Sequence, residues 1–375
     1  MNQRLSKLIK PQRLDALLIS SVPNIIYLTN FFGFSKDERQ AFLLITKNKQ
    51  YILTDGRYSE AVKNNVKDFK LIQISPSLSF EKALRKLCKK HDVKRLGFEG
   101  HNLSFLEHQK LSKHFNKMHD LSISDLRSVK ESNEILAIEK ACELGDKTFD
   151  YILKKIKFGV SEKEIAFEIE LFIEKQGADI SFPPIVAFGK NSSIPHHQTS
   201  DQRLTSKDKF VLLDFGVKLN NYCSDMTRTV FFGKPTTEQK KMYQTVLESQ
   251  KKTINYLKSL ILNHKSIMAK DVDKIARDHI ISKGYKTIPH SVGHGIGLEV
   301  HESPRLSPKS KDILKHGMVF SIEPGIYIPA SPDGGQGGPN FGGVRIEDLV
   351  VLEKSGIKIL THSPKQFIDI LTYLC

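Results

Sequence analysis

Short apolar runs separated by polar turns fill the first third of the chain. Four of them have the length and composition of strands, at Leu14–Ile19, Ala41–Thr46, Tyr51–Thr54 and Phe69–Ile74. Two other segments place apolar residues at helical spacing, Phe80–Lys90 and Ser104–Phe115. This mixture predicts a small α/β domain. The polar stretch Ser122–Ser132 that follows is interpreted as a linker.

After this linker the pattern changes to long helices followed by strands. From Asn133 to Ile156 apolar residues recur every three or four positions, which predicts a helix. Ser161 and Glu164 form a capping box for a second helix that ends near Gly177. Strand-like segments follow at Ile185–Phe188, Phe210–Val217 and Tyr222–Phe232.

The same order of elements repeats in the rest of the chain. Two helices are predicted over Thr237–Leu260 and Ala269–Lys283, and strands over Met318–Ile328 and Gly343–Leu352. The second domain therefore contains two helix–helix–hairpin halves that repeat in architecture but not in sequence. Two such halves facing each other would place their hairpins side by side in one sheet, with the helices outside.

A carboxylate interrupts the most apolar strand of the first half. Asp214 lies within the run Phe210–Phe215, where a lone buried charge is costly. The turn formers Asn220 and Asn221 separate this strand from the next. A hairpin that pivots just before Asn220 places Asp225 directly opposite Asp214, whereas a turn at both asparagines makes the two acids diagonal neighbours. Either register requires a proton or a divalent cation between them.

The second half carries the same irregularity. Glu323 ends the apolar run Met318–Ile322, and Glu347 lies within the apolar run Val344–Val351. One such acid is readily explained by a salt bridge, and scattered lysines could in principle neutralise all four acids. Four acids in core-like strands, two from each half, instead indicate a shared cation site.

A Gly-rich segment offers nitrogen ligands for such a site. The stretch "HSVGHGIGLEVHESP" contains His290, His294 and His301, and its glycines allow close approach of the backbone. Oxygen-rich ligation with one imidazole favours Mn, Fe or Co over a thiolate-bound structural Zn. Four acids exceed the needs of one ion, so two ions about 3.5–4 Å apart, bridged by carboxylates, fit better. Such a pair is suited to amide hydrolysis.

Four segments, "LLDFGVKLNNYCSDMTRT", "HSVGHGIGLEVHE", "SIEPGIYI" and "GGVRIEDLVV", resemble in order and spacing the metallopeptidase family with the pita-bread fold. That family includes Xaa-Pro aminopeptidases, prolidases and methionine aminopeptidases. "YLTNFFGFSKDERQAFLLI" and "YILTDGRYSEA" are similar to the first domain of the proline-specific branch. The resemblance implies an α/β (α+β) protein with a creatinase/prolidase-type N-terminal domain over residues 1–127. A pita-bread catalytic domain with pseudo-twofold halves is implied over residues 128–375.

The resemblance implies two divalent metal ions, most suitably Mn, with Co, Fe or Zn as alternatives. The implied ligands are Asp214, Asp225, His294, Glu323 and Glu347. By similarity Asp225 and Glu347 bridge both ions, Asp214 completes the shell of one, and His294 and Glu323 complete that of the other. A bridging hydroxide attacks the scissile carbonyl, with Glu323 as proton acceptor.

The resemblance also assigns roles to residues around the ions. "SSIPHHQTSD" is similar to a segment with a catalytic histidine, for which we choose His196, with His197 as the alternative. His301 matches a histidine that stabilises the tetrahedral intermediate, and His290 one that lines the substrate pocket. Arg345 is expected to bind substrate or to orient a ligand carboxylate through a salt bridge.

The predicted function is release of the N-terminal residue before proline by an Xaa-Pro aminopeptidase, with an Xaa-Pro dipeptidase (prolidase) as the alternative. Creatinases share both domains but do not keep the metal ligands, all five of which are present here. A non-catalytic peptide- or nucleic-acid-binding protein of the same fold is a remote alternative. The loop Pro329–Gly343 is read either as a hairpin loop or as a flap at the mouth of the site.

Charge and cysteine content indicate which partners the protein binds and in which cellular compartment it functions. The net charge is +15, and residues 1–127 hold 23 of the 57 Lys and Arg but only 12 of the 42 Asp and Glu. The lysines lack interleaved aromatic residues, so we expect a solvated face rather than a nucleic-acid surface. The first residues, MNQRLSKLIKPQRLD, lack the apolar core of a signal peptide, and no apolar run approaches the length of a membrane span. The four cysteines are scattered, which favours the reducing cytoplasm. The expected partners are a proline-containing peptide and, from the resemblance, a second copy of the chain.

Overall fold

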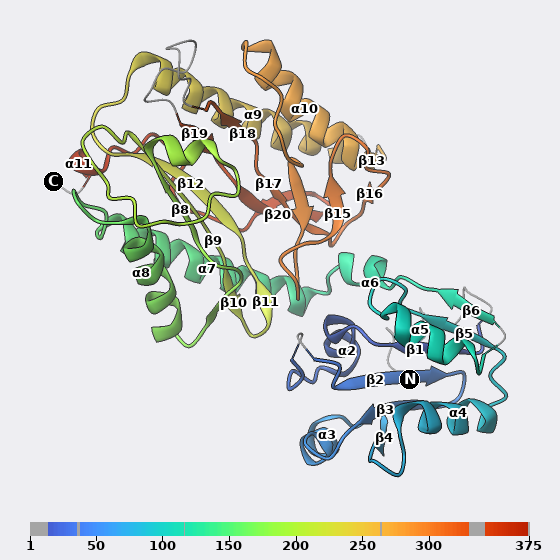
Figure 1. Ribbon diagram of the computed structural model, residues 1–375. Coiled ribbons are helices and arrows are strands. Elements are labelled where there is room, and N and C mark those ends of the chain that lie inside the picture. Colours follow the sequence, from blue (N-terminus) through green and yellow to red (C-terminus); the bar gives the residue numbers. More distant parts are fainter. Residues whose placement is uncertain (1–13, 36–37, 116, 263–264, 330–341, 374–375) are drawn as a thin grey trace. The chain divides into compact units, whose positions relative to one another are not determined.

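The computed structural model describes residues 14–35, 38–115, 117–262, 265–329 and 342–373. They form two compact units, unit 1 (residues 1–127) and unit 2 (residues 128–375), each with its own sheets and apolar core (Figure 1). None of the helices in this described part has both the length and the apolar character that a membrane crossing requires. Of the predicted loop Pro329–Gly343, residues 330–341 lie outside the described residues, so its role stays a prediction.

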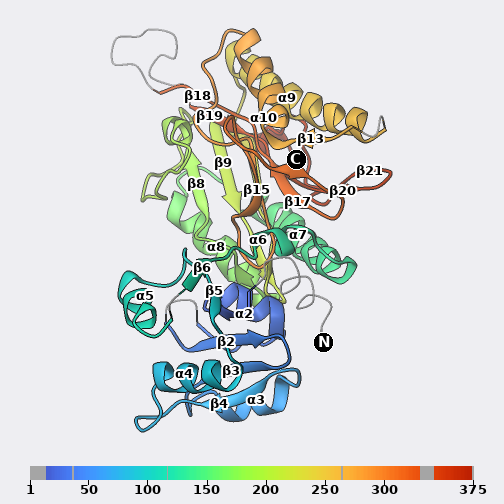
Figure 2. The same cartoon turned by 90° about the vertical axis from the view of Figure 1, so that its right-hand side faces the viewer.

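Unit 1 is built on a six-stranded mixed sheet with the strand order β4-β3-β2-β1-β5-β6. Its strands are β1 (Ala16–Ile19), β2 (Ala41–Thr46), β3 (Gln50–Thr54), β4 (Lys70–Gln73), β5 (Arg95–Phe98) and β6 (Lys117–Asp120). Its helices are α2 (Val22–Thr29), α3 (Ser59–Asn65), α4 (Phe80–Lys90), α5 (Phe105–Ser112) and α6 (Ser124–Ser128). α3 and α4 lie on one face of the sheet and α2 on the other (Figure 2).

The predicted strands and helices of unit 1 are confirmed within three residues at each end, but β5, β6, α2, α3 and α6 were not predicted. α6 lies within the stretch Ser122–Ser132 that was interpreted as a linker. β6 has the sequence KMHD, which carries no apolar signal. α2 is buried on nearly every side, so its sequence lacks the polar face that reveals a helix. Short or fully buried elements therefore lack the alternation of apolar and polar residues from which an element is predicted.

The first half of unit 2 follows the predicted order. It contains α7 (Ser132–Leu153), α8 (Glu162–Lys175), β7 (Asp179–Ile180), β8 (Ile185–Phe188), a 3₁₀ turn η1 (Gly189–Ser193), β9 (Phe210–Phe215), β10 (Val217–Leu219), β11 (Tyr222–Cys223) and β12 (Met226–Phe231). The capping box predicted for α8 is present, with the hydroxyl of Ser161 accepting from the Glu164 N–H. β8, β9 and β12 form one antiparallel sheet, and β7, β10 and β11 form a smaller ribbon.

The hairpin between β9 and β12 settles the two alternative registers. Asn220 and Asn221 both have positive φ, 49° and 68°, and form the two-residue turn. Their side chains tolerate this left-handed backbone, which the tight hairpin turn requires. Asp214 consequently pairs with Thr227 and lies diagonal to Asp225. The register with the two acids directly opposite each other is wrong.

The second half of unit 2 repeats the arrangement. It contains α9 (Thr237–Leu262), β13 (Ile267–Met268), α10 (Ala269–Ser282), β14 (Gly293–Gly295), β15 (Glu302–Leu306), β16 (Ile313–Leu314), β17 (Val319–Ile322), β18 (Gly325–Tyr327), β19 (Gly343–Arg345), β20 (Asp348–Glu353), β21 (Gly356–Ile359) and α11 (Ile370–Tyr373). A five-stranded antiparallel sheet has the order β15-β14-β17-β20-β21. α9 and α10 lie side by side against this half (Figure 1).

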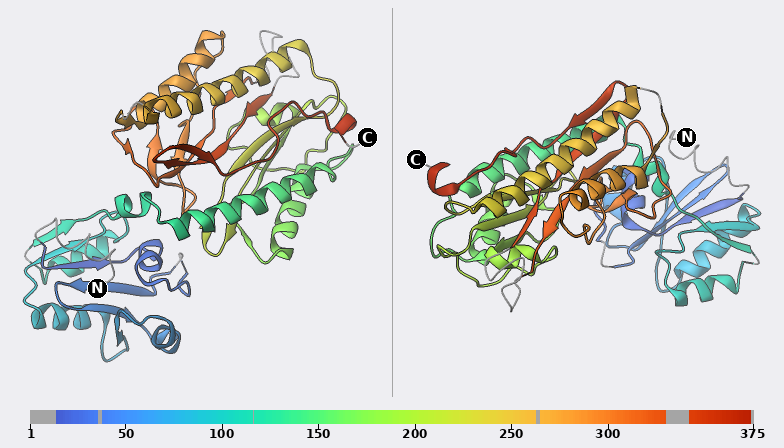
Figure 3. Two further views of the ribbon diagram at one scale, coloured as in Figure 1. Left: turned by 180° about the vertical axis from the view of Figure 1, so that it is seen from behind. Right: turned by 90° about the horizontal axis from the view of Figure 1, so that it is seen from above.

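The long helix α7 joins the two halves (Figure 3). Ile138 shares a core with Val319 and Leu349 of the second half, whereas Leu144 shares a core with Leu213 of the first. One helix therefore packs against both halves of unit 2 and fixes the spacing between their sheets.

The hairpins of the two halves lie side by side, but the prediction of one continuous sheet is wrong. The β12-β9-β8 sheet and the five-stranded sheet have separate ladders. At their junction the N–H of Glu347 donates to the carbonyl of Thr227 (3.1 Å), and the Thr229 hydroxyl donates to the carbonyl of Arg345 (3.0 Å). These bonds between β12 and the segment from β19 to β20 do not extend into a regular ladder, because Ile346 and Glu347 lie outside both strands.

The turn conformation predicts the effect of substitutions at Asn221. Asn221→Val should lower the free energy of unfolding by about 1–2 kcal/mol, because a β-branched residue is strained at positive φ. Asn221→Gly should leave stability unchanged or raise it slightly. Urea unfolding of both variants beside the parent checks this, and equal stability of the two variants would contradict the assigned turn.

Candidate metal centre and active site

The five predicted metal ligands come from strands or strand ends of both halves of unit 2. Asp214 lies in β9, Asp225 directly before β12, His294 in β14, Glu323 directly after β17, and Glu347 between β19 and β20. Asp214, Asp225 and Glu347 are only 8%, 5% and 2% exposed. Residues more than a hundred positions apart thus meet because the two hairpins abut.

The structure brings the ligand atoms close together. Asp225, His294 and Glu347 each offer an atom, and these atoms lie within 4.8 Å of one another. His294 Nε2 lies 3.5 Å from Asp225 Oδ2 and 3.4 Å from Glu323 Oε1. Asp214 is close enough for its charge to raise the pKa of both Asp225 and Glu347. Four carboxylates and one imidazole therefore share one small buried volume.

Burial and the repulsion of neighbouring charges raise the pKa values of Asp225 and Glu347. Burial, opposed by a hydrogen bond from His294 and reinforced by the charges of Asp214 and Glu323, raises the pKa of Asp225 to about 7. Burial and the same neighbouring charges raise the pKa of Glu347 well above its ordinary value. Burial disfavours the charge on His294, but the bond to Asp225 and the charge of Glu323 outweigh it and raise its pKa to about 9. Protons thus substitute for a cation at this centre.

The donor set fits divalent cations. Asp214 Oδ1, Asp225 Oδ1 and Glu347 Oε1 are buried without a hydrogen-bond partner among the described residues. Buried carboxylate oxygens with no donor are costly unless a proton or a cation faces them. Several carboxylates with one imidazole are the ligands that Mn, Fe or Co accept.

Arg345 is buried and its donors are directed inward. It is 4% exposed and donates from Nη2 to Asp214 Oδ2 at 2.5 Å, from Nε to the Thr227 hydroxyl at 3.0 Å, and from Nη1 to the Tyr327 hydroxyl at 2.8 Å. The Thr227 hydroxyl donates in turn to Glu347 Oε2 at 2.7 Å. Arg345 therefore contacts one acid directly and another through a threonine, while its role in binding substrate stays a prediction.

Tyr327 was not singled out from the sequence, although it lies four residues after Glu323. Its hydroxyl accepts from Arg345 and lies 2.8 Å from His290 Nε2, while His290 Nδ1 lies 2.7 Å from the Ser291 carbonyl. Burial raises the pKa of Tyr327 to about 12, so its hydroxyl stays protonated. The only signal for it was a polar-tipped aromatic residue in an otherwise aliphatic strand.

The remaining predicted histidines differ in their surroundings. The ring of His301 stands edge-on to that of His294, with 4.3 Å between centroids. Burial and then the positive charges of His294 and His196 lower the pKa of His301. His196 is exposed, whereas His197 Nε2 lies 2.8 Å from the buried carboxylate of Glu162. Of the two adjacent histidines, His197 is committed to a structural partner.

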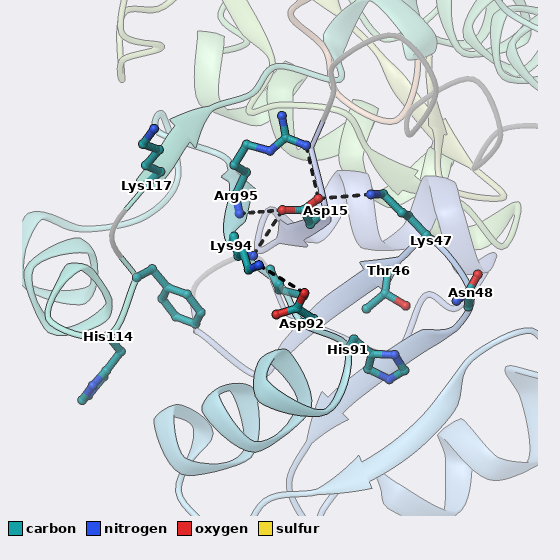
Figure 4. Close-up of a pocket in the computed structure, with 12 residues that line it drawn as sticks. Asp15, Thr46, Lys47, Asn48, His91, Asp92, Lys94, Arg95, His114 and Lys117 are labelled. Atoms are coloured by element: carbon teal, nitrogen blue, oxygen red, sulfur yellow. Dashed lines mark hydrogen bonds and ion pairs between the residues drawn. The ribbon is translucent and has the colours of Figure 1, made fainter.

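A separate cavity of about 770 Å³ lies within unit 1 (Figure 4). Its basic wall is paired internally: Lys47 and Arg95 contact Asp15 at 3.1 and 3.3 Å, and Lys94 lies 3.4 Å from Asp92. Partial burial opposes the charge of Asp15, but the bonds from Arg95 and Lys47 lower its pKa. None of the predicted site residues lines this cavity.

Comparison with known proteins agrees with this geometry. Residues 137–354 match the model of metallopeptidase family M24, and residues 2–129 match that of the creatinase/prolidase N-terminal domain. The chain belongs to metallopeptidase family M24. The predicted family, the mixed α/β fold and the metallopeptidase class are therefore confirmed. Membership implies divalent metal ions, for which the cluster above is the candidate site.

Named relatives include both proline-specific activities. The chain is 36% identical to a Pyrococcus horikoshii Xaa-Pro dipeptidase, over 98% of this chain and 99% of the relative. It superposes on the Xaa-Pro dipeptidase from Bacillus anthracis with a TM-score of 0.87 at 34% identity, covering 98% of each chain. The X-Pro aminopeptidase from Thermotoga maritima gives 0.81 at 33%, covering 95% of this chain and 97% of that one.

The repulsion among the acids predicts how metal and pH act on stability. Asp225 and His294 have raised pKa values in the folded protein, so the stability that their protons provide is lost as pH rises towards about 9. Chelator-treated protein should therefore melt at lower temperature at pH 9 than at pH 5. Added Mn²⁺ should raise the melting temperature most at the higher pH, where the ligands are deprotonated.

Asp225→Asn is the matched control for this experiment. It removes one buried charge, so it should stabilise the metal-free protein at pH 8 and suppress the melting shift that Mn²⁺ causes. Thermal unfolding with and without Mn²⁺ measures both effects. A full metal-induced shift in this variant would contradict a ligand role for Asp225.

The internal contacts of Arg345 predict its effect on metal binding. Arg345→Lys cannot donate to Asp214, Thr227 and Tyr327 at once, so metal affinity should fall by about 10–100-fold. Competition with a fluorescent chelator measures this. Arg305→Lys, an exposed arginine of β15 that donates to the Ser291 hydroxyl, serves as control and should bind metal normally.

Proposed function

We propose that the protein is a dinuclear metal-dependent exopeptidase that hydrolyses the Xaa-Pro bond and releases the N-terminal residue. The observation that carries the proposal is the meeting of four acids, three of them buried, and His294 in one cluster, where the described residues provide too few cations to neutralise them. The proline-specific names of full-length relatives support the substrate class. Proline lacks an N–H, so a site that acts on the carbonyl has an advantage here over one that reads an amide hydrogen.

Asp214, Asp225, His294, Glu323 and Glu347 would hold two divalent ions, for which we propose Mn, with Co, Fe or Zn as alternatives. Such ions, when bound, lower the pKa of water and polarise a peptide carbonyl. Arg345 and Thr227 hold the acids apart at fixed positions, so the site is organised before substrate arrives.

Glu323 is the proposed proton acceptor. Its Oε1 accepts from the Ser321 hydroxyl at 3.1 Å and lies 3.4 Å from His294, and its Oε2 lies 3.9 Å from His290. These contacts fix the carboxylate while leaving an oxygen able to take a proton from water and return it to the departing imide nitrogen. His290 is proposed to line the substrate pocket through this contact.

His196 and His301 are the proposed groups that stabilise the developing oxyanion. The lowered pKa of His301 keeps its imidazole neutral near pH 7, in which form it still carries one N–H donor. We choose His196 over His197 because the imidazole of His197 is paired with Glu162.

The aminopeptidase is proposed ahead of the dipeptidase because of Arg345. A dipeptidase needs a cation to bind the free carboxylate of its substrate beside the metals. Within the described residues, Arg345 is the one Lys or Arg whose side chain pairs with any of the five ligands, and its donors are taken by internal acceptors. The dipeptidase names of several relatives keep the alternative worth testing.

We also propose an oligomeric state and a compartment. The family resemblance supports a homodimer. Cys88, Cys142 and Cys223 are free and buried, which suits a reducing compartment such as the cytoplasm.

Offering the Mn-loaded protein an Xaa-Pro dipeptide and an Xaa-Pro-Yaa tripeptide tests the proposed function. We expect release of the first residue from the tripeptide, detected by chromatography, because an open site accepts a longer chain. Cleavage of the dipeptide alone would establish the dipeptidase instead. Cleavage of neither would contradict the proposal.

His196→Ala should retain its metal content but lower kcat by about 10²–10⁴-fold, the usual contribution of a proton-transfer or oxyanion group. Metal content by mass spectrometry and steady-state kinetics measure the two effects. Loss of metal in this variant would show that His196 is a ligand rather than a partner of the reacting carbonyl.

A further inference from the structure

A buried carboxylate that the proposed mechanism does not use lies beneath the loop that contains His196. Glu162 is the first residue of α8 and is completely buried. The loop, here called the His196 loop, comprises residues 188–200 and has little regular structure beyond η1. Among the described side chains, no lysine or arginine pairs with Glu162.

Five hydrogen bonds from this one loop satisfy the two oxygens of Glu162. Oε1 accepts from the N–H of Phe188 at 2.8 Å and from Asn191 Nδ2 at 2.9 Å. Oε2 accepts from His197 Nε2 at 2.8 Å and from the N–H and hydroxyl of Ser200 at 3.0 and 2.6 Å. Because Phe188 and Ser200 are the two ends of the loop, one carboxylate fastens it as a closed unit.

The middle of the loop is held from the opposite side by the second half of unit 2. Arg345 Nη1 donates to the carbonyl of Pro195 at 3.2 Å, and the N–H of Gly343 donates to the Ser192 hydroxyl at 2.7 Å. A Cβ at Gly343 would lie 2.0 Å from the Ser192 carbonyl oxygen, so no larger residue fits there. The loop is therefore clamped between α8 and β19.

His196 lies between the two clamped positions. Pro195 on one side is bound by Arg345, and His197 on the other is bound by Glu162. The side chain of His196 itself is exposed, and the Arg345 that binds Pro195 also donates to the proposed metal ligand Asp214 at 2.5 Å. The two adjacent histidines thus have different tasks, one holding the loop and one presented by it.

We propose that Glu162 is a positioning residue that, through His197 and Ser200, holds the His196 loop and so fixes His196 beside the metal centre. The inference rests on the proposed function for the role of His196. Glu162→Gln has the same shape but replaces one oxygen by an amide NH₂. Either orientation of that amide faces N–H donors with another donor, so the loop loses part of its fastening.

A double-mutant cycle with His196 distinguishes a positioning role of Glu162 from a general effect of Glu162→Gln on stability. Glu162→Gln should lower kcat by about 10²-fold in the parent, as expected when a catalytic group is misplaced by about 1 Å. In the His196→Ala background the same substitution should cost less than about threefold, because the group it positions is already gone. KM and metal content should stay near those of the parent. Equal costs in both backgrounds would overturn the proposal.

Glu164→Gln is the matched control on the same helical turn. The Glu164 carboxylate accepts from the Ser161 N–H at 2.7 Å and lies 3.5 Å from the exposed Arg203, and the His196 loop contributes none of its donors. This variant should lower the melting temperature slightly and leave kcat unchanged. A fall in kcat equal to that of Glu162→Gln would mean that any weakening of the start of α8 suffices, which would overturn the specific role of Glu162.

Hydrogen exchange tests the fastening without relying on activity. Peptides that cover residues 188–200 should exchange faster in Glu162→Gln, and in the milder Ser200→Ala, but not in Glu164→Gln. Ser200→Ala removes the 2.6 Å donor to Glu162 and the 3.2 Å acceptor of the Gln202 N–H, and leaves the four other bonds to Glu162 in place. Unchanged exchange in the first two variants would overturn the proposal even if activity falls. If the parent cleaves neither Xaa-Pro substrate, the proposed function fails, whereas accelerated exchange would still support the anchoring.

Discussion

The electrostatic repulsion among buried acids from two facing hairpins is the constraint on which unit 2 depends. Asp214 and Asp225 belong to one half, and Glu323 and Glu347 to the other. The burial of Asp214, Asp225 and Glu347 limits the screening of their charges by water. Within the protein, protons on Asp225 and His294 relieve part of this repulsion. A fold that places such groups together is stabilised by whatever cation it binds, because metal-binding energy adds to folding energy.

The surrounding contacts keep the two halves in place against this repulsion. Arg345 and Thr227 connect Asp214 to Glu347 on the side of the metal centre. Arg228, 1% exposed, donates to Asp348 Oδ1 at 2.8 Å and to the Ser363 carbonyl at 3.1 Å. Since Asp348 follows Glu347 and Arg228 follows Thr227, the strands that carry the ligands are locked at adjacent positions by a second ion pair. The ligands are thus fixed by buried polar contacts rather than by a continuous ladder.

The strands do not position all of the histidines of the proposed active site. His294 lies on a strand, but His196 lies in a loop that Glu162 and Arg345 fasten from opposite sides. A loop can bring a side chain to a metal centre without contributing to a sheet, and here its backbone donors are satisfied by one carboxylate. Arg345 contacts both the ligand Asp214 and the His196 loop, so the geometry of the metals and that of the loop are coupled.

The sequence by itself located most of the elements of unit 2 and the acids that cluster there. Helical periodicity located α7 to α10, turn chemistry placed the hairpin at Asn220 and Asn221, and acids in apolar runs marked the positions that meet at the centre. These signals are local, since each depends on residues within a few positions of one another. The choice between two hairpin registers, however, required the backbone conformation of the turn.

Tertiary structure alone decided which side chains face one another. Glu162 looks like an ordinary acid in a first helical turn, and only its approach to residues 35 and 38 positions away gives it a role. The partner of Arg345, Asp214, lies 131 residues away, so no local pattern could identify it. Such contacts depend on how two independently patterned halves dock, and no local pattern of hydrophobic and polar residues encodes that geometry.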